Sequence, residues 1–303
     1  MNADRPPTID PAAALRWGAM DAPSSPWLHE EVARRMQERL QWIKLRCTPW
    51  ADWEPARGGL QAHAGLVRRH PQSERYVVES GAKLAQRAVA SVTRPWWSPQ
   101  RWRLGPTHFR APADGAVQMV WANMALHMAH DPQALIGQWH RALGQDGFLM
   151  FSCLGPDTLR ELRALYQEQG WPPAMHAFTD MHDWGDMLVA AGFAEPVMDM
   201  ERIRLSFASP RRLLQELREL GRNLHGARFA ALRGRQWREQ LERHLERHLA
   251  EPQQGGALAL TFEVIYGHAI KPAPRLPLQS ETVLSLEAMR AALRQGKRAV
   301  SPG

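Results

Sequence analysis

The sequence has little of what marks a secreted or membrane-spanning protein. Its 303 residues include only two cysteines, Cys47 and Cys153, too few for a disulfide framework and without the spacing of metal ligands. No run of about 18 apolar residues occurs, and the first residues form neither a charged leader nor an apolar stretch. We therefore expect a cytoplasmic protein with no membrane span.

Repeats and metal-ligand clusters are lacking as well. The 23 prolines are spread over connecting segments, and no internal repeat is present, which excludes a solenoid. Five histidines (127, 130, 176, 182 and 268) are scattered, without a pair one helical turn apart beside a carboxylate. The sequence therefore predicts no metal site.

Charge is in excess on the positive side. The formal net charge is +7 and the sequence pI is about 10.1, so the surface will attract nucleic acid, an anionic membrane or an acidic protein. A basic run interleaved with aromatic residues, typical of proteins that bind single-stranded nucleic acid, does not occur. Nucleic acid is therefore not the expected partner.

Apolar patterns predict alternating strands and helices. Runs of strand length occupy residues 49–53, 76–78, 116–122, 148–154, 197–207 and 257–268. Amphipathic or capped stretches predict helices at 26–46, 60–70, 82–92, 131–143, 156–170, 183–192, 210–221, 233–249 and 281–294. Turns are expected at 54–59 and 144–147. The alternation over 49–207 implies right-handed crossovers and a parallel sheet, hence an α/β fold.

Four strings carry a resemblance to one known family. FSCLGPDTLRELR, FTDMHDWGDMLVAAGFAEPVMDME, LRELGRNLHGAR and FEVIYGHAIKP occur in the order and spacing of the malonyl-acyl-carrier-protein O-methyltransferases of biotin synthesis, the BioC family. The helix string HEEVARRMQERLQWIKL also resembles that family. The likeness covers roughly residues 26–272.

The resemblance implies a fold and a domain plan. The fold is that of class I S-adenosylmethionine-dependent methyltransferases: a Rossmann-like sheet of seven strands in the order 3-2-1-4-5-7-6, with the cofactor at the carboxyl ends of the first strands. A helical lid over the substrate corresponds to residues 156–177 and 209–255 of a methyltransferase-like domain spanning 26–272. Residues 1–25 are then a flexible N-terminus, and residues 273–303 are a C-terminal tail.

The family's first cofactor motif is an acidic residue followed by alternating glycines, which lets the backbone approach S-adenosyl-L-methionine closely. The matching stretch here is DWEPARGG, in which Glu54, Gly58 and Gly59 are expected to hold the cofactor. Pro55 and Arg57 stand where the family has glycine or a small residue. Because proline removes an amide and fixes φ, the loop must follow another path.

The resemblance assigns further cofactor positions. Glu79 ends the second strand, where the family places an acidic residue that binds the ribose hydroxyls; without the resemblance, it is simply an exposed carboxylate. Asn123 follows the fourth strand and is expected to line the site, although a strand-end cap explains it equally well. The family's adenine segment, Gly-Asp-Ala, corresponds to residues 105–107, where the aspartate is missing.

Methyl transfer to a carboxylate needs little acid or base help, because the sulfonium already carries its leaving group and positioning supplies most of the catalysis. We therefore assign no catalytic residue. Acyl carrier proteins are acidic, so the resemblance implies a basic docking face on the lid. The residues assigned to it are Arg211, Arg212, Arg218, Arg222 and Arg228. The other interpretation is an ordinary solvated helix surface.

Two functions remain open from the sequence. The first is an enzyme that methylates a carboxylate on a carrier-protein thioester of the malonyl type, with S-adenosyl-L-methionine as cofactor. The second is a catalytically silent relative that serves as a partner-binding or regulatory module, because the cofactor motif has changed while the lid strings are intact.

Overall fold

The computed structural model describes residues 9–22, 24–92, 104–251, 253, 255–273 and 287. The chain divides into two units, Met1–Pro272 and Ala273–Gly303, and every element below belongs to the first. The expected helix at 281–294 lies outside the described residues, except for Glu287. In these described ranges, no helix is both long and apolar enough to cross a membrane.

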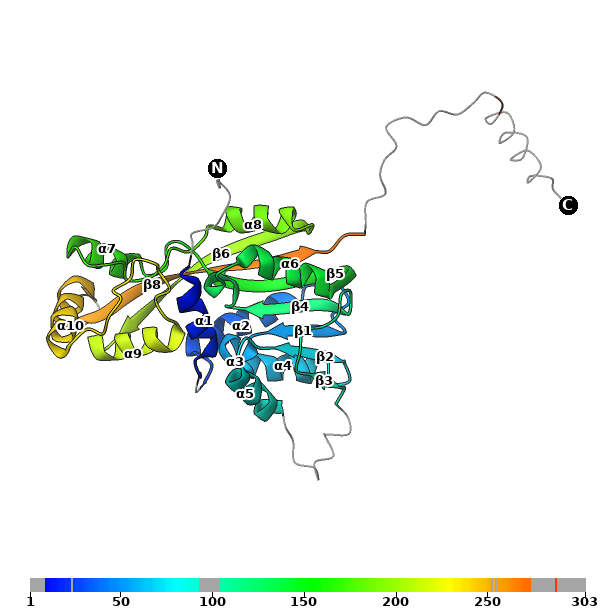
Figure 1. Cartoon of the computed structure of the whole chain (residues 1–303), viewed down its shortest axis with the longest axis horizontal. Coiled ribbons are helices and arrows are strands. Elements are labelled where there is room, and N and C mark those ends of the chain that lie inside the picture. The colour runs from blue at the N-terminus through cyan, green and yellow to red at the C-terminus, as the bar shows by residue number, and fades with distance from the viewer. Residues whose placement is uncertain are drawn as a thin grey trace. The chain divides into compact units, whose positions relative to one another are not determined.

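One sheet forms the centre of the first unit (Figure 1). Its strands are β1 (Trp50–Trp53), β2 (Arg75–Val78), β3 (Thr107–His108), β4 (Val117–Asn123), β5 (Leu143–Leu154), β6 (Ala194–Phe207), β7 (Ala250–Glu251) and β8 (Ala257–Ile270). They lie in the order β3-β2-β1-β4-β5-β8-β6, with β7 pairing only with β8. If the two-residue β7 is left out of the count, this is the predicted order 3-2-1-4-5-7-6. The strands β1 to β5 pair in parallel, and β8 runs antiparallel between β5 and β6.

Helices cover both faces of the sheet. They are α1 (Pro11–Ala19), α2 (Trp27–Leu40), α3 (Pro55–Gly58), α4 (Leu60–Arg69), α5 (Ala82–Val92), the 3₁₀ helix η2 (Leu126–Met128), α6 (Pro132–Ala142), α7 (Arg160–Glu168), α8 (Met181–Ala190), α9 (Pro210–Leu220) and α10 (Arg235–Leu249). Buried side chains of α2 and α4 share one core with one face of the sheet, whereas those of α6 and α8 share a second core with the other face.

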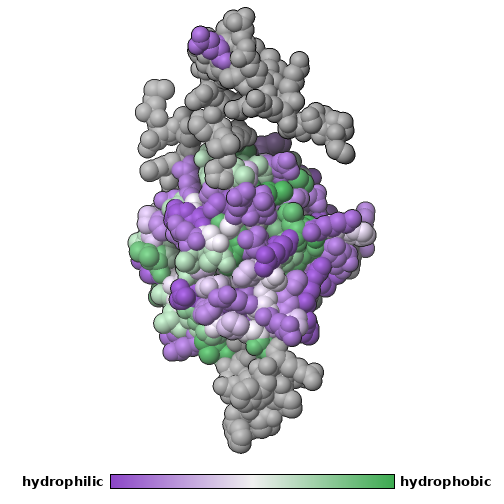
Figure 2. Space-filling model, turned by 90° about the vertical axis from the view of Figure 1, so that its right-hand side faces the viewer, coloured by the Kyte–Doolittle hydropathy of each residue, from purple (hydrophilic) through white to green (hydrophobic). Residues whose placement is uncertain are grey.

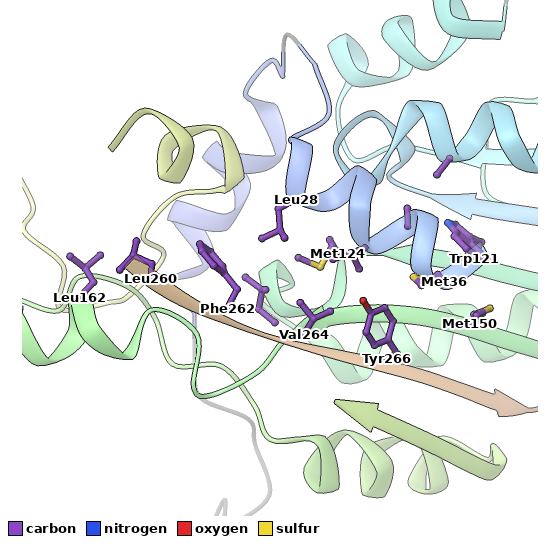
Figure 3. Packing of buried hydrophobic residues seen from close by; sticks show 14 of the residues in the cluster. Leu28, Met36, Trp121, Met124, Met150, Leu162, Leu260, Phe262, Val264 and Tyr266 are labelled. Atoms are coloured by element: carbon purple, nitrogen blue, oxygen red, sulfur yellow. The ribbon is translucent and has the colours of Figure 1, made fainter. Parts of the chain in front are cut away.

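The two cores follow from the alternation of side chains along each strand. In β1, Trp50 belongs to the core under α2, and Ala51 belongs to the core under α6. Figure 3 shows Leu28 and Met36 of α2 among the side chains of the first core, which continues along β8 to Phe262. That core also includes apolar residues of α7, α9 and α10, so the sheet and the predicted lid segments are packed as one body.

Two turn predictions differ from the structure. Residues 55–58 form the short helix α3, because Pro55 has the fixed φ and the missing amide that suit a first helical position. The expected turn at 144–147 is part of β5, in which the pairing with β4 shifts register between Val117 and Met119. A bulge therefore accommodates these residues without ending the strand.

The expectation of a flexible segment over residues 1–25 is wrong for residues 11–19, which form α1. Its N-cap is Asp10, whose Oδ1 accepts a hydrogen bond from the amide of Ala12 at 2.9 Å. The segment is held to the chain after α9, because the amide of Asp10 donates to Leu224 O at 2.9 Å and Arg228 pairs with the Asp10 carboxylate at 2.6 Å. Helix α1 is thus a docked part of the fold.

The side of the molecule seen in Figure 2 is mainly hydrophilic, with hydrophobic residues in small groups between charged ones. Such scattered apolar residues are normal on a protein surface and indicate no binding site. In an open α/β sheet, ligands bind at the carboxyl ends of the parallel strands.

Candidate functional site

The carboxyl ends of β1, β2 and β4 bring three predicted site residues together. In the parallel register Trp53 pairs with Val78, and Asp52 pairs with Trp121, so Glu54, Glu79 and Asn123 all follow at one edge of the sheet. Glu54 lies in the left-handed region at φ 57°, and its amide donates to Val78 O at 2.7 Å. Burial raises the pKa of Glu54, and the nearby Arg57 opposes this shift.

Glu79 binds the loop that follows β1. Its Oε1 accepts a hydrogen bond from the amide of Ala56 at 2.7 Å and so caps the first turn of α3. Its Oε2 is buried and has no hydrogen-bond partner among the residues described. Burial raises the pKa of Glu79 to about 8, although the Ala56 amide opposes this shift. At neutral pH this side chain is therefore largely a protonated helix cap.

Asn123 also binds the loop. Its side-chain amide donates to Gly58 O and, at 2.9 Å, to His29 O, while Ser152 Oγ donates to its Oδ1 at 2.6 Å. A Cβ added at Gly58 would lie 2.6 Å from Asn123 O, closer than real Cβ contacts. Gly58 is therefore required for the packing of α3 against β4. Gly59, at φ 145°, adopts a backbone that favours glycine.

Arg57 points across the carboxyl ends of the strands to α1. Its Nη2 donates to Trp17 O at 2.6 Å and to Met20 O at 2.7 Å, and its Cζ lies 3.9 Å from the centroid of the Trp17 ring. The residue is only 6% exposed. We call this set of contacts the Arg57 clamp. On its other side, His29 Nδ1 donates to Arg57 O at 2.9 Å.

Little space is left around the Arg57 clamp. The hollow bounded by Trp17, Arg57, Gly58 and Asn123 has a volume of about 10 Å³. Next to it, a cleft of about 660 Å³ lies between α1, the loop after β1 (Glu54 and Arg57), the residues after β2 (Ser80 among them) and those after η2. A ligand at this edge of the sheet therefore has room between α1 and Arg57, while the hollow next to Gly58 and Asn123 is filled by protein.

A larger cavity lies between the predicted lid segments. Its volume is about 740 Å³, and most of its wall is apolar. The apolar wall includes Leu154, Leu159, Leu162, Leu214, Leu217, Trp237, Leu241 and Phe262. His127 lines it, is 5% exposed, and has a buried Nδ1 with no hydrogen-bond partner in the described part of the chain. Burial holds the pKa of His127 well below its usual value, so the ring is neutral.

The predicted docking arginines fall into two groups. Arg211, Arg218 and Arg222 line the cavity, and within the described ranges none of them forms an ion pair with a carboxylate. Arg212 pairs with Glu216, and Arg228 pairs with Asp10. The first group is therefore available to an anionic ligand, whereas the second stabilises the fold.

Comparison with curated sequences identifies the family. The chain is 37% identical over 261 residues to the malonyl-[acyl-carrier protein] O-methyltransferase of Gallionella capsiferriformans, covering 82% of this chain and 86% of that protein. It is 36% identical to the protein of the same name from Laribacter hongkongensis, covering 82% and 84%. The chain belongs to the malonyl-[acyl-carrier protein] O-methyltransferase family. No family model matches the sequence.

Solved structures support the same fold. The YcgJ protein of Bacillus subtilis superposes with a TM-score of 0.52 at 14% identity, covering 79% of this chain and 99% of that chain. A Bacillus halodurans C-125 protein, described as a candidate methyltransferase, gives the same TM-score and identity over 79% and 100%. The predicted class I methyltransferase fold is confirmed.

The predicted cofactor residues lie close together, as the family pattern requires, but their hydrogen-bonding groups are bound by other parts of the chain. Glu79 accepts from Ala56 of the α3 loop, and Asn123 donates to Gly58 of the same loop. In the pattern expected for the family, the amino-acid end of S-adenosyl-L-methionine lies over the glycines of the loop after β1, and the hollow of about 10 Å³ beside Gly58 cannot contain it. With Arg57 in this position, the residues around Gly58 do not fit that end of the cofactor, and the open space lies on the other side of Arg57.

The assignment of residues 105–107 to the adenine segment is wrong. Arg75, the first residue of β2, donates from its amide to Pro106 O at 3.0 Å, and Thr107 is the first residue of β3. The segment therefore lies at the amino ends of the strands, whereas the candidate site lies at their carboxyl ends.

Sequence reasoning also missed Trp17 and Met20, which complete the Arg57 clamp. The signal that could have revealed their helix is the pair Asp10-Pro11, since aspartate at an N-cap followed by proline marks a helix start.

Proposed function

We propose that the chain is an S-adenosyl-L-methionine-dependent O-methyltransferase that acts in biotin synthesis, in the cytoplasm. Its substrate is the free carboxylate of a malonyl-type thioester on an acyl carrier protein. The observation that carries the proposal is the 37% identity to a protein of that name, extending over 86% of that protein's length. The identity extends over most of both chains, which supports a substrate of the same class.

The cavity between the lid segments supports the substrate side of the proposal. An apolar wall suits the acyl arm, and the guanidinium groups of Arg211, Arg218 and Arg222 suit a carboxylate or the acidic carrier. Arg222 is half-buried, and burial lowers its pKa, with the neighbouring Arg218 adding to this effect. A positive charge held there without a carboxylate is stabilised when an anion binds.

The activity is tested with purified chain, malonylated carrier protein and S-adenosyl-L-methionine, followed by intact-protein mass spectrometry. We expect the carrier to gain the mass of one methyl group. Acetylated carrier protein is the matched control, because it has the same thioester but no free carboxylate, and it should gain nothing. Transfer to both carriers, or to neither, contradicts the proposal.

The docking face is tested by charge reversal at one cavity arginine. Arg218→Glu should reduce retention of the malonylated carrier on immobilised chain by roughly tenfold, since a steering charge is replaced by a repulsive one. Arg235→Glu is the control: Arg235 is also in a charged lid helix, but it is 91% exposed and does not line the cavity. Equal retention by both variants would remove the docking face.

A second function is favoured by the Arg57 clamp. If the amino-acid end of the cofactor never enters, the chain is a catalytically silent family member that binds the carrier protein as a partner or regulator. The two functions predict different results in the mass assay, but the same retention of the carrier. A chain that retains malonylated carrier and transfers no methyl group is the silent form.

A further inference from the structure

The carboxyl end of α1 and the loop after β1 are joined by one buried cation. The last carbonyls of a helix have no partner within it, and positive charge is favourable at that end. Arg57 donates to Trp17 O and Met20 O there and stacks on the Trp17 ring. Arg57 therefore acts as a C-terminal cap for α1, supplied from a distant part of the chain.

The charges around Arg57 explain its place. Burial lowers the pKa of Arg57, and the acidic side chains Glu54 and Glu79 at the strand ends oppose this shift when they are ionised. S-adenosyl-L-methionine carries positive charge on its sulfonium and on its amino group, and negative charge on its carboxylate. The guanidinium thus supplies, from within the chain, one positive charge, which equals the net charge that this end of the cofactor would bring.

We propose that the amino-acid end of the cofactor and the Arg57 clamp compete for one position, so that cofactor binding requires Arg57 to leave and α1 to loosen. This inference rests on the proposed function. The apparent affinity for a ligand falls by the fraction of molecules in which its site is open. Competition therefore weakens binding of any ligand that carries the amino-acid end.

The nucleoside end has a separate place. The cleft of about 660 Å³ is lined by Gly18 of α1, by Arg57 and by Ser80 and Gly81, which follow β2. A nucleoside that lacks the amino-acid end can occupy this cleft without displacing Arg57. The clamp therefore discriminates between two ligands that differ only in that end.

These two ligands are S-adenosylhomocysteine and 5′-methylthioadenosine, and calorimetric titration measures both. Arg57→Ala should tighten binding of S-adenosylhomocysteine by roughly tenfold or more and change that of methylthioadenosine by less than about twofold. Trp17→Ala, which removes the ring but keeps the guanidinium, should act in the same direction with a smaller effect. Arg16→Ala is the matched control, since Arg16 is an exposed neighbour in α1 outside the clamp, and it should change neither affinity.

Circular dichroism melts establish that each variant is folded, and Trp17→Ala tests the inference if Arg57→Ala is not. The inference is overturned if the wild type binds S-adenosylhomocysteine with an affinity equal to or higher than that of both Arg57→Ala and Trp17→Ala. If that result accompanies methyl transfer by the wild type, the proposed function stands without the clamp. If Arg57→Ala binds S-adenosylhomocysteine tightly while no form of the chain transfers a methyl group, the clamp stands and the proposed function fails.

Discussion

Glu79 should make the stability of the protein fall as pH rises through neutrality. Its carboxyl has one hydrogen bond, from Ala56, and a second oxygen that is buried without a partner among the described residues. Its pKa is raised by burial from 4.5 to about 8. Between these values the folded chain binds the proton and the unfolded chain does not, so raising the pH lowers the free energy of unfolding.

The size of this effect can be estimated. One group titrating fully contributes about 1.4 kcal/mol per pH unit. Glu79 is only partly buried, so screening by water reduces the effect, and we expect a loss of about 1–2 kcal/mol between about pH 6 and about pH 8. Glu79→Gln keeps the oxygen that accepts from Ala56 and removes the titration. Between the two pH values, the unfolding free energy of the wild type should therefore fall by that amount relative to that of Glu79→Gln.

Urea unfolding of both proteins at the two pH values measures the shift. Glu246→Gln, at an exposed position of α10, is the control for loss of a surface carboxylate and should show no pH-dependent difference from wild type. A difference between wild type and Glu79→Gln that stays constant with pH would refute a protonated Glu79. The carboxylate would then be ionised, as a ribose-binding residue should be.

Three further variants test the contacts around the site. Gly58→Ala should lower the free energy of unfolding by about 1–3 kcal/mol in chemical denaturation, because its Cβ would crowd the end of β4, and an unchanged midpoint contradicts this. Asp10→Ala removes the α1 cap and the ion pair with Arg228; it should cost about 1 kcal/mol and speed tryptic cleavage within α1 while the rest stays intact. His63 Nδ1 lies 2.7 Å from Oδ2 of Asp52, and both side chains are buried. His63→Ala leaves the Asp52 carboxyl group without this partner, so its thermal midpoint should fall below that of the double variant Asp52→Asn/His63→Ala.

The sequence predicted the sheet and most helices because their signals are local. The apolar run FLMFSCL lies in β5, and Asp131 caps α6 through the amide of Ala134 at 2.9 Å, as its position before a proline predicts. The same Asp-Pro signal precedes α1, but a nine-residue helix is marginal without tertiary contacts. Those contacts come from Arg57 and Arg228, which are distant from α1 in the sequence, and no local sequence pattern predicts them.

The candidate site was harder to predict from the sequence. Its residues are of the types that the family uses to bind the cofactor, but in the structure their side chains bind other parts of the chain. Glu79 looks like an intact ribose acid in sequence, yet in the structure it accepts from an amide 23 residues earlier. Asn123 looks like a site residue or a strand-end cap, and it holds Gly58 and His29. The interpretation of Asn123 as a cap agrees better with these contacts. The carbonyl oxygens to which it donates, however, belong to α2 and α3 and not to its own strand.

The residues that replace the glycines of the family's first motif form a consistent set of contacts, which random loss of the motif would not produce. Pro55 occupies a position where its missing amide costs nothing, and the next residue, Ala56, presents its amide to Glu79. Arg57 is buried, and a buried guanidinium is destabilising unless it is paired; here Nη2 donates to two carbonyls and the group stacks on a ring, while Nε has no hydrogen-bond partner among the described residues. These contacts offset part of the cost of burying the arginine and tie the loop to α1. The loop after β1 therefore stabilises α1 through Arg57, and these are the contacts that the proposed competition with the cofactor would break.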